Sequence, residues 1–285
     1  MSPARRLLAL EWIAVMGTAL AASGCASDAA AHPSEGPAAP VPARWGDWTL
    51  FEIDGQLVYA ADADDAEDAA ATRAAAGQAF RERTGRQPGA RLLLVADTSS
   101  WMPGGDPCRR LELAEDAFAA LRGPAAANDD RSLPQSCETL RADAAEIGVE
   151  PALMLGLVAH PVLPARLPEL GVPAGAGSAP WPFDWVVLLP TEDALDEAFE
   201  VILDAGMENE LSFGERLIAA PFMPMARGVV VDGLLARQQV LLFELEAASQ
   251  ADWSLEDRAR LTESFEDELE GEVSSDVQSS SGAGA

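Results

Sequence analysis

Several residue types on which common enzymes depend are missing or scarce in this 285-residue sequence. It contains no lysine, which excludes Schiff-base catalysis, the phosphate-binding loop and the kinase lysine. The two histidines, His32 in a Pro-rich stretch and His160, cannot build a two- or three-histidine metal site. Neither an HExxH nor a GxSxG motif occurs, so most common hydrolase mechanisms are excluded as well.

Positive charge is scarce too. The chain carries 19 arginines against 47 Asp and Glu residues, and its formal net charge is −28. Such a polyanion repels the phosphate backbone of nucleic acids, so no nucleic-acid partner is expected. Anionic lipid head groups repel it for the same reason, which suits a domain held away from a membrane on a tether.

The first residues have the pattern of a secretory signal. Arg5 and Arg6 form a basic start, and an apolar run from Leu7 to Ala22 follows, interrupted only by Glu11. The run is too short for a comfortable membrane span, which needs roughly 20 apolar residues. Residues 1–24 are therefore predicted to be a signal peptide that is removed on export.

The segment Ala22-Ser23-Gly24-Cys25 resembles the lipobox of bacterial lipoproteins. In that family the cysteine thiol carries a diacylglycerol, and cleavage leaves it as the first residue. The resemblance implies a protein exported and lipid-anchored through Cys25 to the cell membrane or outer membrane, facing the periplasm or exterior. Ala26, where an inner-membrane retention Asp would stand, favours the outer membrane. The alternative is plain secretion after the small-x-small site Ala19-Leu20-Ala21.

The rest of the chain divides by composition. Residues 25–43 contain the lipid-bearing cysteine and a Pro/Ala-rich linker without large side chains, which predicts disorder. Residues 272–285 form a second disordered segment, a Ser/Gly-rich tail. The stretch between them, 44–271, has the length of a single globular domain.

Two cysteines remain once Cys25 is assigned to lipid. Cys108 and Cys137 lie near the starts of two predicted helices, and exported thiols more often pair than stay free. A disulfide between them closes a loop of about 30 residues, worth roughly 3–4 kcal/mol in the chain-entropy model. The alternative is a pair of buried, unlinked thiols.

The apolar pattern predicts a mixed α/β fold, with a small sheet, an N-terminal β-hairpin and a helix-rich C-terminal half. Asp54-Gly55 between two β-favouring runs marks the hairpin turn. An Ala-rich helix follows and ends at Gly85. Uninterrupted apolar runs predict buried strands at 91–97 and 183–190. Further helices are predicted at the segments 111–121, 137–147, 208–220, 227–248 and 254–270, with a Pro/Gly loop at 161–182. Another helix is predicted to follow its cap Thr191-Glu192-Asp193. The apolar segment 151–161 is either a buried helix or a central strand, and its Leu, Met and Ala residues favour the helix.

The most specific candidate for a ligand-binding site lies at the end of the strand predicted at 91–97. In the segment Asp97-Thr98-Ser99, Asp97 and Ser99 match the start of the Asp-x-Ser-x-Ser motif of von Willebrand factor type A domains, while Trp101 replaces the second serine. The resemblance implies a divalent cation held by oxygen ligands, and no other cofactor is expected. The alternative is that these residues end a strand and begin a turn.

A third resemblance lies in the order of the predicted secondary-structure elements. The hairpin, the helix ending at Gly85 and the strand at 91–97 are similar to the opening of some gluzincin-type peptidase domains. Without the zinc histidines, this implies a catalytically inactive scaffold.

Three hypotheses for function result. The first is a lipid-anchored envelope protein with a non-catalytic binding or scaffolding role and an envelope protein as partner. The second is a cation-dependent adhesion-type module using Asp97 and Ser99. The third is the inactive peptidase-like scaffold. An enzyme is not favoured, and the oligomeric state is left open.

Overall fold

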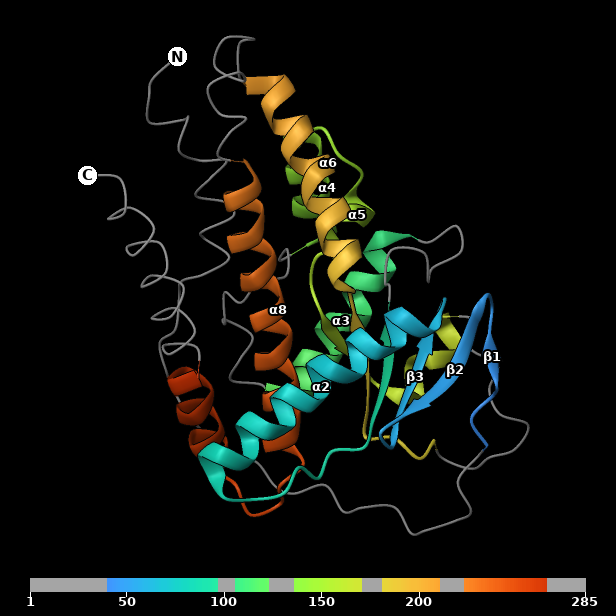
Figure 1. Ribbon diagram of the computed structural model, residues 1–285, viewed down its shortest axis with the longest axis vertical. Helices are drawn as coiled ribbons and strands as arrows, with labels where there is room; N and C mark the ends of the chain where they lie inside the picture. Colours follow the sequence, from blue (N-terminus) through green and yellow to red (C-terminus); the bar gives the residue numbers. More distant parts are fainter. Residues whose placement is uncertain (1–39, 97–105, 123–135, 171–180, 211–222, 266–285) are drawn as a thin grey trace.

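The computed structural model describes residues 40–96, 106–122, 136–170, 181–210 and 223–265 (Figure 1). The predicted signal peptide, Cys25, most of the linker and the predicted tail lie outside these ranges. The described elements are β1 (Arg44–Trp45), β2 (Trp48–Ile53), β3 (Gln56–Ala60), α2 (Ala63–Thr84), β4 (Leu92–Ala96), α3 (Pro107–Arg122), α4 (Cys137–Ile147), α5 (Pro151–Gly156), β5 (His160–Val162), the 3-10 helix η3 (Pro164–Leu170), β6 (Trp185–Leu189), α6 (Glu192–Glu210) and α8 (Met223–Ala248). Residues 255–265 are also helical.

One six-stranded sheet of order β1-β2-β3-β4-β6-β5 organises the fold. β1, β2 and β3 pair antiparallel, β3, β4 and β6 run parallel, and the short edge strand β5 returns antiparallel to β6. The prediction of a mixed α/β fold with an N-terminal hairpin and a helix-rich C-terminal half is confirmed. Figure 1 shows the hairpin strands on one side of the molecule and helices α4, α5 and α6 gathered away from them.

The hairpin turn forms at the predicted position. Asp54 and Gly55 have φ of 49° and 77°. Both residues of a type I′ turn need positive φ, and Asp and Gly tolerate that conformation best. The turn sets Ile53 opposite Gln56 and so fixes the register of the whole β2–β3 pair.

Both faces of the central strands are buried, which explains why their sequences are apolar without alternation. One face packs on α2 and α8, and its strand residues are Val58, Ala60, Leu92, Leu94, Ala96, Val187 and Leu189. The opposite face packs on the hairpin tryptophans, α3 and η3, and its strand residues are Tyr59, Leu93, Val95, Val186 and Leu188. The strands predicted at 91–97 and 183–190 correspond to β4 and β6.

Helix α2 is delimited by its caps. The Asp62 carboxylate accepts hydrogen bonds from the backbone nitrogens of Asp64 at 2.9 Å and Asp65 at 3.1 Å. These bonds satisfy amides that have no partner within the helix. At the other end, Gly85 has φ of 66° and donates to the carbonyl of Arg81, which closes the helix in the left-handed conformation.

The segment 151–161 contains both a helix and a strand, so the favoured prediction of one helix and the alternative of one central strand each hold for only a part of it. Helix α5 stops at Gly156, and His160–Val162 forms strand β5 against Val186–Leu188 of β6. Pairing with the sheet edge outweighs the helix propensity of the segment, and Pro161 is tolerated because β5 is an edge strand. The loop predicted for 161–182 likewise contains β5 residues and the 3-10 helix η3.

The three residues before β1, residues 41–43, contact the strands that follow them. The buried Tyr59 hydroxyl donates to the carbonyl oxygen of Pro42 at 2.5 Å, and the backbone nitrogen of Leu50 donates to the carbonyl of Ala43 at 3.0 Å. Val41 packs beside the same hairpin. Burial raises the pKa of Tyr59 to about 12, so its hydroxyl remains a donor at neutral pH. The buried hydroxyl needs an acceptor, and the end of the linker supplies it.

The helix predicted at 227–248 lies within α8, the longest described helix. Its second half carries Leu241, Leu242 and Leu245 onto the sheet. No helix among the described residues is long and apolar enough to cross a membrane.

A buried ion pair fixes α2 against α8. Arg73 of α2 pairs with Glu246 of α8, and the two side chains are almost completely enclosed. The second oxygen of Glu246 accepts hydrogen bonds from the backbone nitrogens of Gly89 at 2.7 Å and Ala90 at 3.0 Å. Because these amides precede β4, one carboxylate connects both helices to the entry of the central strand.

Replacing this carboxylate should destabilise the fold strongly. Glu246→Gln keeps the shape and an acceptor oxygen but leaves the Arg73 guanidinium buried without its counter-charge. Breaking a buried pair from one side costs about 3–5 kcal/mol, and urea unfolding measures this loss. Asp252→Asn, which breaks the exposed pair with Arg86, is the control and should change little. Equal losses in the two variants would contradict the role given to Glu246.

Candidate functional site

The carboxyl ends of the three parallel strands meet at one edge of the sheet. β3 ends at Ala60, β4 at Ala96 and β6 at Leu189, and β4 lies between the other two. In open α/β sheets this edge is where ligands collect. Asp97 follows β4 directly in the sequence. Asp97 and Ser99 lie outside the described residues, so the cation hypothesis stays a prediction.

A buried Arg–His pair lies beside this edge. Arg110, in the first turn of α3, donates from Nε to His160 Nε2 at 3.1 Å. His160 begins β5 and is in register with Leu188, next to the last residue of β6. The guanidinium also donates from NH2 to the carbonyl of Leu155 at 3.3 Å. These contacts join α3, α5 and β5 at the same point of the sheet.

His160 is held in its neutral form. Its Nε2 accepts from Arg110, so Nδ1 carries the proton and donates to the carbonyl of Val158 at 2.9 Å. Burial, followed by the nearby Arg110 charge, lowers its pKa to about 3. The imidazole is 0% exposed. Both ring nitrogens are already engaged, so this histidine positions α3 rather than serving as a base for a substrate from solvent.

Helices α6 and α8 contact the residues that directly follow β6. Gln238 of α8 is buried and donates from Nε2 to the carbonyl of Pro190 at 2.8 Å. The buried Thr191 hydroxyl accepts from the backbone nitrogen of Ala194 at 3.2 Å and caps α6, as the sequence predicted. Arg227 of α8 then contacts α6 farther along, donating to Asp196 at 2.8 Å.

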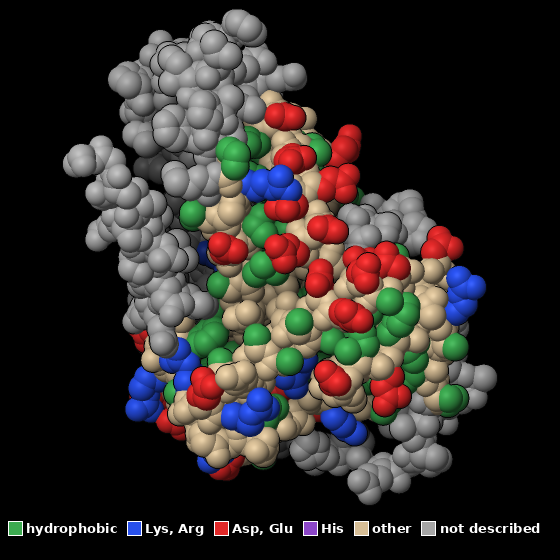
Figure 2. Space-filling view, viewed as in Figure 1, with side chains coloured by type: hydrophobic (Ala, Val, Ile, Leu, Met, Phe, Trp, Pro, Cys, Tyr) green, Lys and Arg blue, Asp and Glu red, His purple; other side chains and the backbone are tan. Residues whose placement is uncertain are grey.

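Exposed carboxylates crowd the surface formed by α6 and the start of α2 (Figure 2). They are Asp64, Glu67, Asp68, Glu192, Asp193, Glu197 and Glu200. Partial burial, with the negative charges of Asp193 and Asp64, raises the pKa of Asp68. Within the part of the chain that the structure describes, no group of three or more His, Cys, Asp or Glu side chains could hold a metal ion.

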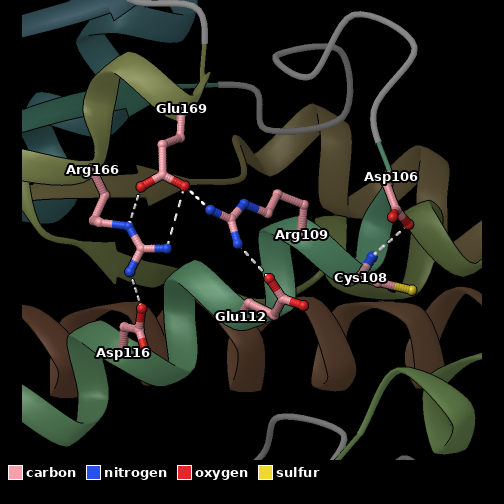
Figure 3. A network of polar contacts seen from close by, with 7 residues as sticks. All are labelled: Asp106, Cys108, Arg109, Glu112, Asp116, Arg166 and Glu169. Carbon is pink, nitrogen blue, oxygen red and sulfur yellow. Dashed lines mark hydrogen bonds and ion pairs between the residues drawn. The ribbon is translucent and has the colours of Figure 1, made fainter.

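A second charged group links α3 to η3 on the surface (Figure 3). Glu169 of η3 pairs with Arg109 of α3 and with Arg166 of its own helix, and Arg166 also pairs with Asp116 of α3. Arg109 contacts Glu112 at 2.5 Å. Arginine suits this arrangement because its planar guanidinium can serve two carboxylates at once. The group docks η3 along the outer side of α3.

The two cysteines that the sequence paired lie together. Their Cα atoms are 5.0 Å apart, within the range of a disulfide, and the two positions are separated by 29 residues. Cys108 is in the first turn of α3 and Cys137 begins α4. Cys25 lies outside the described residues, so its lipidation stays a prediction.

Sequence reasoning missed the buried arginines, although the pattern contains a signal for each. Arg110 lies one helical turn before the buried Ala114 in α3. Arg73 stands in the small-residue stripe of α2, between Ala70 and Ala76. A single arginine in a stripe of buried positions indicates a paired cation in the core. The partners, however, come from distant elements that periodicity cannot identify.

No protein-family model, curated protein or solved structure matches this chain. The function proposed below therefore depends on the residues and geometry of the chain itself.

The buried His160 should make the protein sensitive to acid. Its folded pKa of about 3 lies below the ordinary value of 6.5, so the unfolded chain binds a proton that the folded chain does not. Stability from this group is complete above pH 6.5 and falls towards pH 3, by at most about 1.4 kcal/mol per pH unit. His160→Gln should lose this part of the slope, measured by urea unfolding between pH 7 and pH 4.

His32→Gln, at the only other histidine, provides the matched control and should keep the wild-type pH dependence. If His160→Gln and wild type give parallel curves of unfolding free energy against pH, then His160 is not held neutral in the folded protein.

Proposed function

We propose that the chain is an exported lipoprotein, anchored at the cell envelope through Cys25, whose globular part binds or scaffolds another envelope protein without catalysing a reaction. The proximity of Cys108 and Cys137 carries this proposal. Disulfides form and persist in oxidising compartments outside the cytosol, and this pairing leaves Cys25 as the one cysteine available for lipid.

The start of the domain supports a tethered arrangement. Tyr59 and Leu50 hold Pro42 and Ala43, so the chain joins the domain at the hairpin. Fourteen residues, 26–39, separate Cys25 from the first described residue, Pro40. At about 3.1 Å per residue, a Pro-rich segment of this length reaches roughly 40 Å when extended. The net charge of −28 keeps the domain away from anionic lipid while the acyl chains hold it nearby.

The environment of the single body histidine supports a non-catalytic role. His160 is the side chain best suited to acid–base catalysis at neutral pH, and it is enclosed, neutral and hydrogen-bonded on both nitrogens. The binding partner follows from charge: a protein surface rich in Lys and Arg would complement the acidic surface over α6 and the start of α2.

Removal of the lipid-bearing thiol should release the protein from the membrane. In cells fed labelled fatty acid, Cys25→Ser is expected to lose the label and to move from the membrane fraction to the soluble fraction. The double variant Cys108→Ser/Cys137→Ser also removes thiols but leaves Cys25, so it should stay labelled. A Cys25→Ser protein that retains both label and membrane association would refute the lipid anchor.

The cation-dependent alternative makes a different prediction. A cation bound by Asp97 and Ser99 would raise the thermal midpoint of the wild type in Mg²⁺, Mn²⁺ or Ca²⁺, because ligand binding stabilises the folded state. Asp97→Ala would abolish this rise, and Thr98→Ala, at the intervening position, would keep it. If the protein binds no cation, none of the metals changes the thermal midpoint of wild type, Asp97→Ala or Thr98→Ala.

A further inference from the structure

The Cys108–Cys137 bridge lies beside a small apolar cluster, separate from the clusters on the two faces of the sheet. α4 buries only two side chains, Leu140 and Ala144. They join Leu111 of α3 and two residues of α5, Met154 and Leu155, in a small apolar cluster. The clusters on the two faces of the sheet each contain many more large buried side chains. Local opening is easiest where few apolar contacts hold an element in place.

Two polar contacts of α4 and α5 stand out among the described residues. Arg110 donates to the carbonyl of Leu155, which fastens the end of α5. Near the bridge, the ion pair between Arg141 of α4 and Asp106 is exposed and long, at 3.7 Å. Both helices also contact α6. The covalent bridge is thus the strongest connection between the start of α4 and α3.

The bridge is open to attack by a thiol. Cys108 and Cys137 are each partly exposed, and each lies in the first turn of its helix. The positive end of a helix stabilises a thiolate, which makes a cysteine there a better leaving group. Asp106 offsets part of this effect at α3, because its carboxylate accepts from the Cys108 backbone nitrogen at 3.1 Å (Figure 3). Glu138 in the first turn of α4 acts in the same sense as Asp106. Arg109 in the first turn of α3 and Arg141 in the second turn of α4 act in the opposite sense.

We infer that Cys108–Cys137 is a reversible redox lock: its reduction by a dithiol opens α4 and α5 while the sheet with α2 and α8 stays folded. One thiolate of the reductant attacks a bridge sulfur and releases the other as a thiolate, forming a mixed disulfide. The second thiolate of the reductant displaces the protein sulfur and closes the oxidised reductant. Two electrons and two protons pass to the protein, which gains two thiols.

Opening would expose the apolar side chains that α4 and α5 now cover, Leu111, Leu140 and Leu155 among them. It would also loosen the first turn of α3, which lies beside the carboxyl edge of the sheet. The inference goes beyond the proposed function, because it concerns the purified protein and does not depend on the lipid.

Hydrogen exchange measured by mass spectrometry tests the lock. Purified, oxidised protein is compared before and after treatment with dithiothreitol in native buffer, and thiol counting confirms the reduction. Amides of residues 137–156 should then exchange at least about tenfold faster, while β3, β4, β6, α2 and α8 keep their protection. Removing dithiothreitol and adding its oxidised form should restore the original pattern.

The variant Cys108→Ser/Cys137→Ser is the matched control. It should show the reduced pattern without dithiothreitol and should not respond when dithiothreitol is added. Three results would overturn the inference: a bridge that is reduced only in denaturant, exchange that is unchanged by reduction, or loss of protection across the whole domain. Loss of protection across the whole domain would show that the bridge stabilises the entire fold.

Discussion

A single carboxylate without access to solvent organises the centre of this protein. Glu246 neutralises Arg73 and accepts the amides of Gly89 and Ala90, so α8, α2 and the entry to β4 share one polar contact. Burying these charges separately would cost several kcal/mol each, and only their mutual pairing makes the arrangement stable. The same contact holds the two helices side by side over one face of the sheet. The apolar packing of Leu241, Leu242 and Leu245 then follows from that position.

The excess of acid over base determines how the rest of the fold is held together. Arg109, Arg166 and Arg227 each pair with two carboxylates, which the fork of the guanidinium allows. Arg166 connects η3 to α3, and Arg227 connects α8 to α6 through Asp196 and Glu200. Carboxylates beyond those paired with arginine collect on the outer surface of α6 and the start of α2. A lysine-free chain thus uses arginine to connect elements and leaves an acidic surface towards its surroundings.

Helix α3 is the element on which the functional proposals converge. Its buried side chains reach three different clusters: Leu111 packs with α4 and α5, Leu113 with the hairpin tryptophans, and Leu121 with α2 and α8. Its first turn also contains Cys108 and Arg110, so the bridge and the buried Arg–His contact start from the same place. Under the redox inference, opening the bridge would loosen this turn beside the carboxyl edge of the sheet, where a ligand of an α/β fold would bind.

The sequence by itself determined features that depend mainly on neighbours along the chain. Strands β4 and β6 were predictable because burial on both faces makes them continuously apolar, and the hairpin because Asp54-Gly55 accepts positive φ. The nearness of Cys108 and Cys137 was predicted from their positions near two helix starts and from the expectation of export. Only the tertiary structure decided that His160 lies in a strand, because that strand forms by backbone pairing with the free side of β6. It also decided which distant groups bind the buried arginines, Glu246 for Arg73 and His160 for Arg110, because contacts between residues far apart in sequence leave no periodic trace.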